Sequence, residues 1–154
     1  IEHLNPYYVL EVMRKINSAM AISAKLILTT PNIASLFRRL RLLLGMQPQY
    51  KYHVHEYTKS EVEELLTKSG FKVIRSYYSP VNDLTYVDAK EPGQHLTPCS
   101  YLSLVKHAFA NPTKTNIARL LAYPLVKLAP PLRQLITIVA EKISEPKAMP
   151  VERW

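Results

Sequence analysis

Residues 25–32, Lys-Leu-Ile-Leu-Thr-Thr-Pro-Asn, constrain the fold of this chain more than any other stretch. A short apolar run that ends in small polar residues is typical of a buried strand whose carboxyl end faces a ligand site in an open α/β sheet. Pro31 ends the strand because proline has no amide hydrogen to donate to a sheet. Histidines flank this stretch, His3 upstream and His53 and His55 downstream. The pattern predicts an α/β protein with a functional site beyond the end of this strand.

Periodicity and capping signals predict the other elements of the chain. Apolar residues at helical spacing predict helices at residues 6–18, 33–44, 101–110 and 115–128. Another helix begins at Thr58 or Ser60, each followed by a glutamate three residues later, and stops at Gly70. Further strands are predicted at residues 71–78 and 132–143. Residues 81–100 mix Pro, Gly, Asn and Asp without periodicity, which predicts a long loop.

The formal net charge of +8 is unevenly distributed along the chain. Residues 13–54 contain several Lys and Arg but no Asp or Glu, and residues 92–140 likewise hold only basic charges. Such a surface attracts anionic partners such as nucleic acid, phosphorylated small molecules or anionic lipid, although a solvated basic face has the same composition. A non-catalytic basic module that binds nucleic acid or an anionic membrane is therefore one interpretation of the sequence.

The sequence also bears on the cellular compartment. The chain has a single cysteine, Cys99, and does not start with a charged and apolar leader, which favours a reducing compartment. Lys and Arg interrupt every apolar stretch before it reaches the ~20 residues that a membrane-spanning helix needs. We therefore expect a cytoplasmic protein that is at most peripheral to a membrane.

Four short motifs follow one another in a recognisable order. They are Glu2-His3-Leu4, Thr29-Thr-Pro-Asn32, His53 with Glu56-Tyr57-Thr58, and Ser69-Gly-Phe-Lys-Val73. In this order and spacing, the motifs resemble the C-terminal half of a class I S-adenosylmethionine-dependent methyltransferase. The resemblance implies an α/β fold, the C-terminal portion of a Rossmann-like sheet. In that sheet strand seven lies antiparallel between strands five and six, and here extra helices are added.

The resemblance also implies a domain plan and a cofactor. Residues 1–80 would be the C-terminal half of the methyltransferase core, 81–131 a loop and helical insertion or lid, 132–143 the last core strand and 144–154 a tail. The chain has only three glycines, so it contains no Gly-rich nucleotide loop. We therefore expect the main S-adenosylmethionine contacts upstream of residue 1, in a missing N-terminal half of the same protein. The 154 residues alone are then expected to bind no cofactor, to transfer no methyl group and to fold poorly or self-associate.

His3 is the candidate catalytic residue. By the resemblance, Glu2 and His3 follow strand four beside the donor sulfonium, where a small-molecule, sugar or lipid-like acceptor must approach. An unperturbed imidazole titrates near pH ~6.5 and can accept a proton at neutral pH. The alternative is that His3 only packs at a helix start, and that Glu2 only favours the helix amino terminus rather than holding a base or substrate.

Glu2, Asn32, His53, His55 and Tyr57 are the candidate substrate-binding residues. Asn32 offers a donor and an acceptor at a strand end, although it is also a common turn residue and helix cap. If residues 53–57 are extended, His53, His55 and Tyr57 share one face that could close over the substrate. Alternatively, this segment is a hydrogen-bonded loop that anchors the next helix.

A metal is not expected on the main interpretation. Metal-dependent small-RNA 2′-O-methyltransferases nevertheless resemble this arrangement, because they combine acidic residues and a histidine after strand four with a histidine from a later loop. Glu2, His3 and His53 would match that set. Adjacent Glu and His are also common in metal-free relatives.

Overall fold

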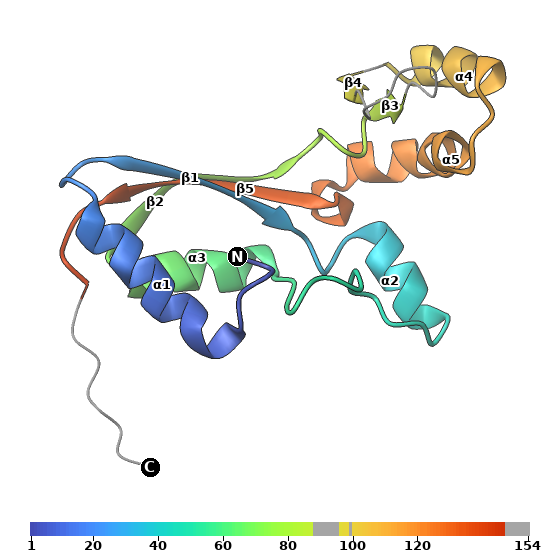
Figure 1. Ribbon diagram of the computed structural model, residues 1–154. Coiled ribbons are helices and arrows are strands. Elements are labelled where there is room, and N and C mark those ends of the chain that lie inside the picture. Colours follow the sequence, from blue (N-terminus) through green and yellow to red (C-terminus); the bar gives the residue numbers. More distant parts are fainter. Residues whose placement is uncertain (88–95, 99, 147–154) are drawn as a thin grey trace. The chain divides into compact units, whose positions relative to one another are not determined.

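The computed structural model describes residues 1–87, 96–98 and 100–146 (Figure 1). Cys99 and most of the expected tail at 144–154 lie outside these residues. The chain forms two compact units. Unit 1 comprises Ile1–Pro31, Gln49–Tyr77 and Ile136–Trp154, and unit 2 comprises Asn32–Pro48 and Tyr78–Leu135. Each unit is built from segments that are distant in sequence.

A three-stranded sheet forms the centre of unit 1. Its strands are β1 (Lys25–Pro31), β2 (Phe71–Ser79) and β5 (Leu135–Lys142), in the order β1-β5-β2. The amide of Lys142 donates to the carbonyl of Ala24 at 3.0 Å, and the amide of Ile143 donates to that of Gly70 at 3.2 Å. The end of β5 therefore lies beside the starts of β1 and β2, so β5 is antiparallel to both. This order agrees with the one that the resemblance implied.

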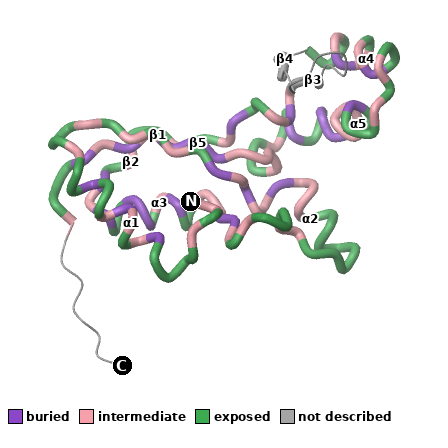
Figure 2. The backbone as a smooth tube through the Cα atoms, in the orientation of Figure 1, coloured by how far each residue is buried: buried purple, intermediate pink, exposed green. Residues whose placement is uncertain are grey.

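Helices α1 (Pro6–Ala19) and α3 (Lys59–Lys68) pack on one face of this sheet (Figure 1). Asn5 caps α1 by accepting a hydrogen bond from the amide of Tyr7 at 3.0 Å. Thr58 and Glu61 form the predicted capping box of α3. Figure 2 marks buried positions on these elements, and the buried apolar residues of unit 1 include Val9, Met13, Val62, Leu66, Phe71, Ile136, Ile138 and Ala140. The core of unit 1 thus lies between the two helices and β5.

The other face of β1 is exposed, which corrects the expectation that residues 25–30 form a buried strand. Ile27 is 69% exposed, whereas its neighbours Leu26 and Leu28 are partly buried. The alternation arises because β1 is an edge strand and, within the described residues, helices cover only one face of the sheet. The strand itself was predicted; its exposure depends on which elements pack against it.

Unit 2 is mainly helical. It contains α2 (Leu36–Leu43), α4 (Tyr101–Ala110), α5 (Lys114–Leu128) and the short 3₁₀ helix η1 (Pro130–Leu132). Helices α4 and α5 pack against each other and bury Leu104, Ala108, Ala122 and Val126. Strands β3 (Thr85–Val87) and β4 (Leu96–Pro98) pair antiparallel, with Tyr86 opposite Thr97. The expectation of a long loop over residues 81–100 is therefore wrong where these strands form.

Two predicted boundaries differ from the structure. Helix α2 begins at Leu36 rather than at residue 33, because the Asn32 side chain accepts a hydrogen bond from the amide of Ala34 and holds this stretch in a turn. The last strand begins at Leu135 rather than at residue 132, because Leu132 belongs to η1 and the two residues after it form a bend. None of the helices in the described part of the chain is both long and apolar enough to cross a membrane.

Candidate functional site

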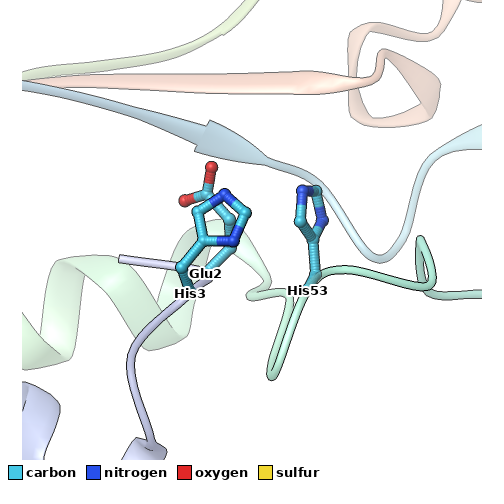
Figure 3. A group of neighbouring side chains, drawn as sticks. All are labelled: Glu2, His3 and His53. Atoms are coloured by element: carbon cyan, nitrogen blue, oxygen red, sulfur yellow. The ribbon is translucent and has the colours of Figure 1, made fainter.

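Three of the predicted site residues come together in unit 1. Glu2 and His3 precede α1, and His53 lies in the loop before α3 (Figure 3). One nitrogen or oxygen atom of each side chain lies within 4.8 Å of those of the other two. The rings of His3 and His53 meet edge to face, with their centroids 5.0 Å apart. We refer to these three residues as the Glu2–His3–His53 cluster.

Backbone hydrogen bonds hold the two segments of this cluster together. The carbonyl of Glu2 accepts the amides of Val54 at 2.8 Å and His55 at 3.2 Å. The first residues of the chain are thereby fixed to the loop that carries His53. Asn5 then starts α1, so the direction of the chain on both sides of His3 is set by hydrogen bonds.

The carboxylate of Glu2 connects the cluster to the end of β1. Its Oε2 atom accepts a hydrogen bond from Oγ1 of Thr30 at 3.1 Å. A hydrogen bond of this kind favours the charged form of a carboxyl and holds the Glu2 side chain at the end of the strand.

His53 is oriented by a buried carboxylate. Its Nδ1 atom lies 2.7 Å from Oε1 of Glu56, whose side chain is fully buried. The same Oε1 accepts the amide of Tyr50 at 3.1 Å. A carboxylate oxygen only accepts hydrogen bonds, so Nδ1 of His53 carries the proton and donates it to Glu56, and Nε2 is the nitrogen that can bind a ligand.

His3 is oriented in the same way by a backbone carbonyl. Its Nδ1 atom lies 3.1 Å from the carbonyl oxygen of Tyr52. A carbonyl oxygen only accepts hydrogen bonds, so Nδ1 of His3 carries the proton and Nε2 is the basic nitrogen. His3 is exposed, and this nitrogen can therefore be reached from solvent.

His55 and Tyr57 form a separate pair next to the cluster. Their rings meet edge to face at a centroid distance of 4.5 Å. Tyr57 is only 6% exposed, and its hydroxyl has no hydrogen-bond partner among the described residues. Burial, followed by the charges of Glu61 and Glu2, raises the pKa of Tyr57. The segment forms no regular strand, and His53 contacts His3 and Tyr50 whereas His55 contacts Tyr57.

Asn32 belongs to unit 2, and its side chain is fully engaged there. Its amide nitrogen donates to the carbonyls of Pro131 at 3.0 Å and Arg133 at 2.7 Å, and its oxygen accepts the amide of Ala34. Asn32 is buried. These contacts give it a structural role, and its role in substrate binding stays a prediction.

Sequence reasoning did not assign a role to Glu56. The residue was part of a recognised motif, but nothing marked it as the group that orients His53. The spacing of three residues between His53 and Glu56 is the one available signal, and it becomes informative only when the loop between them folds back on itself.

Neither a protein-family model nor a curated protein sequence matches the chain. Among solved structures, the chain is similar to an S-adenosylmethionine-dependent methyltransferase from Archaeoglobus fulgidus, with a TM-score of 0.50 and 18% identity. The similarity covers 92% of this chain and 55% of that one, so this chain spans about half of that protein's length. At this identity the similarity establishes a methyltransferase-like α/β fold.

Proposed function

We propose that this chain forms the acceptor side of a class I S-adenosylmethionine-dependent methyltransferase that acts on a small-molecule, sugar or lipid-like acceptor. The sheet order β1-β5-β2, with antiparallel β5 at its centre, carries the proposal, together with the similarity over 92% of the chain. On this proposal, β1, β2 and β5 are strands five, six and seven of the methyltransferase sheet. A fold is shared by many functions, so the site has to support the assignment as well.

S-adenosylmethionine supplies an activated methyl group, and its main contacts lie outside this chain on our proposal. The nucleotide part of such cofactors is held by a Gly-rich turn between a strand and a helix. The described glycines with positive φ, Gly45 and Gly70, follow the ends of α2 and α3 instead. We therefore place the cofactor loop upstream of residue 1.

His3 is the proton acceptor in this proposal. The cluster is tied to the end of β1 by the hydrogen bond between Thr30 and Glu2, and open α/β sheets bind ligands at strand ends. Nε2 of His3 would accept the proton that the acceptor atom loses on methylation, and the cofactor would supply the methyl group. The hydrogen bond from Nδ1 to Tyr52 holds the ring in the tautomer that this step needs.

Glu2 and His53 are proposed to bind polar groups of the acceptor beside His3. Both side chains lie in the cluster, and Thr30 and Glu56 fix their orientation. His55 and Tyr57 are proposed to border the same acceptor, and the buried hydroxyl of Tyr57 is available to donate a hydrogen bond.

A methyl-transfer assay tests the proposal. The product of the complete coding sequence is incubated with methyl-labelled S-adenosylmethionine and, in separate reactions, with small-molecule, sugar, lipid or RNA acceptors. We expect label to enter a small-molecule, sugar or lipid acceptor. A protein that binds the cofactor but labels only RNA would instead favour the RNA-directed class of methyltransferase.

A lipid surface is a second candidate partner, favoured by the exposure of α2. No residue of this helix is buried in the described structure, and Leu43 is 82% exposed beside Arg39 and Arg41. An exposed apolar side chain with basic neighbours on a helix can bind the surface of an anionic membrane. The protein should co-sediment with phosphatidylglycerol vesicles, and Leu43→Ser should lower the fraction of protein in the vesicle pellet. Equal retention by phosphatidylcholine vesicles would contradict an anionic preference.

A further inference from the structure

We propose that Glu2, His3 and His53 form a binding site for a divalent transition-metal ion. One potential ligand atom from each residue lies within 4.8 Å of the other two (Figure 3). Ligands of one ion stand about 3–3.5 Å apart when each bond measures ~2.1 Å. Side-chain rotation can close this difference, because Glu2 and His53 are only partly buried and His3 is exposed.

The hydrogen bonds around both imidazoles carry the inference furthest. Histidines that ligate a metal nearly always donate their other ring N–H to a carboxylate or a backbone carbonyl, which fixes the tautomer and the ring orientation. Here Nδ1 of His53 is 2.7 Å from a Glu56 oxygen, and Nδ1 of His3 is 3.1 Å from the Tyr52 carbonyl. The Nε2 atoms of both histidines are thereby left to coordinate an ion.

Charge and ligand type indicate which ions fit. Two carboxylates, Glu2 as a ligand and Glu56 behind His53, balance the two positive charges of a divalent ion. Two imidazole nitrogens with one carboxylate suit Zn²⁺, Co²⁺, Mn²⁺ or Fe²⁺, whereas Mg²⁺ and Ca²⁺ prefer oxygen ligands. The exposed position of His3 leaves open coordination positions for water or for an oxygen of an acceptor.

The metal site does not rest on the proposed methyl transfer, because its ligands lie within residues 1–154 and need no cofactor. It does bear on the role of His3. Proton acceptance and metal coordination both use Nε2 of His3, so one molecule performs only one of them at a time. In metal-loaded protein, the ion instead of His3 would lower the pKa of an acceptor hydroxyl.

Metal titration of the purified, metal-free chain tests the inference directly. Zn²⁺ binding is followed by calorimetry, and Co²⁺ binding by its visible absorption, which reports nitrogen coordination. His3→Ala and His53→Ala should each weaken Zn²⁺ binding by more than about tenfold, the lower bound for loss of even an outer-sphere partner. His55→Ala and His107→Ala are matched controls, since both remove an imidazole that lies outside the cluster.

The outcomes are distinguishable. Binding of one Zn²⁺ that is lost in the two cluster variants and kept in the two controls supports the site. Absence of Zn²⁺ and Co²⁺ binding overturns it, as does binding that His3→Ala leaves unchanged. Circular dichroism of each variant separates loss of binding from loss of folding; His3→Ala is decisive because His3 is exposed. None of these readouts requires methyl transfer, so the proposed function can fail independently.

Discussion

Nδ1 of His53 lies 2.7 Å from Oε1 of Glu56, a carboxylate whose side chain is fully buried three residues further along the chain. The contact fixes the ring of His53 toward Glu2 and His3 and closes the loop that precedes α3. A buried carboxylate is stable only when hydrogen bonds compensate for lost hydration, so the loop and the site depend on the same residue.

Glu56→Ala should therefore destabilise the protein. The substitution leaves the Tyr50 amide and Nδ1 of His53 without their shared acceptor, and losing such a partner costs about 1–3 kcal/mol. Urea unfolding measures the change in the free energy of unfolding. Glu64→Ala is the matched control, because Glu64 is exposed and forms an ion pair with Lys68 on the surface of α3. Equal effects of the two substitutions would show that Glu56 does not support the loop.

His3→Ala should lower the rate of methyl transfer without unfolding the protein. Loss of a general base typically reduces kcat by about 10²–10⁴-fold. S-adenosylmethionine affinity should stay unchanged, because the main cofactor contacts are proposed elsewhere. Single-turnover kinetics of the complete protein measure the effect, with His107→Ala as the control. A variant with unchanged kcat would mean that proximity alone drives the reaction.

Asp83 should make stability fall as pH rises through the mildly acidic range. Burial raises the pKa of Asp83 above its ordinary value, despite hydrogen bonds from Gln134 and the nearby charges of Arg119 and Arg133. Between the ordinary and the raised pKa the folded state binds more protons than the unfolded state, so the free energy of unfolding decreases with rising pH. Asp83→Asn should remove this contribution, as measured by the free energy of unfolding in urea at a series of acidic pH values above the ordinary pKa of an aspartic acid. If the free energy of unfolding has the same pH dependence in the variant and the parent, Asp83 does not make this contribution.

The exposed face of β1 should promote self-association of the 154-residue chain. Ile27 is 69% exposed on an edge strand, and apolar edges pair readily with other chains. Ile27→Lys should shift sedimentation velocity profiles toward the monomer. Leu43→Lys, which changes an exposed leucine on α2, should leave the sedimentation velocity profile unchanged. If both variants and the parent sediment as monomers, this face needs no partner.

Local signals predicted much of the fold. Thr58 marks the start of α3, and its side chain accepts the amide of Glu61 as the predicted capping box requires. The pairing of β3 with β4 was missed because each strand has three residues, too few for a periodic pattern. The start of α2 was missed because the Asn32 turn competes with the helix.

The site was predicted less completely than the fold. Glu2, His3 and His53 could be grouped because each lies in one of the motifs that carry the methyltransferase resemblance. The structure brings the three side chains together. Glu56 was missed because its role arises from a loop that folds back on itself. The sequence is compatible with Asn32 as a turn residue or as a substrate-binding residue, and its hydrogen bond to the amide of Ala34 is that of a turn residue.

Calorimetric titration with S-adenosylmethionine tests the central claim most directly. The experiment compares the 154-residue chain with the product of the complete coding sequence. We predict saturable binding to the complete protein and no measurable binding to residues 1–154, whose described glycines form no nucleotide loop. A complete protein without affinity for the cofactor would contradict the methyltransferase assignment, and tight binding to the 154-residue chain would contradict our placement of the cofactor contacts.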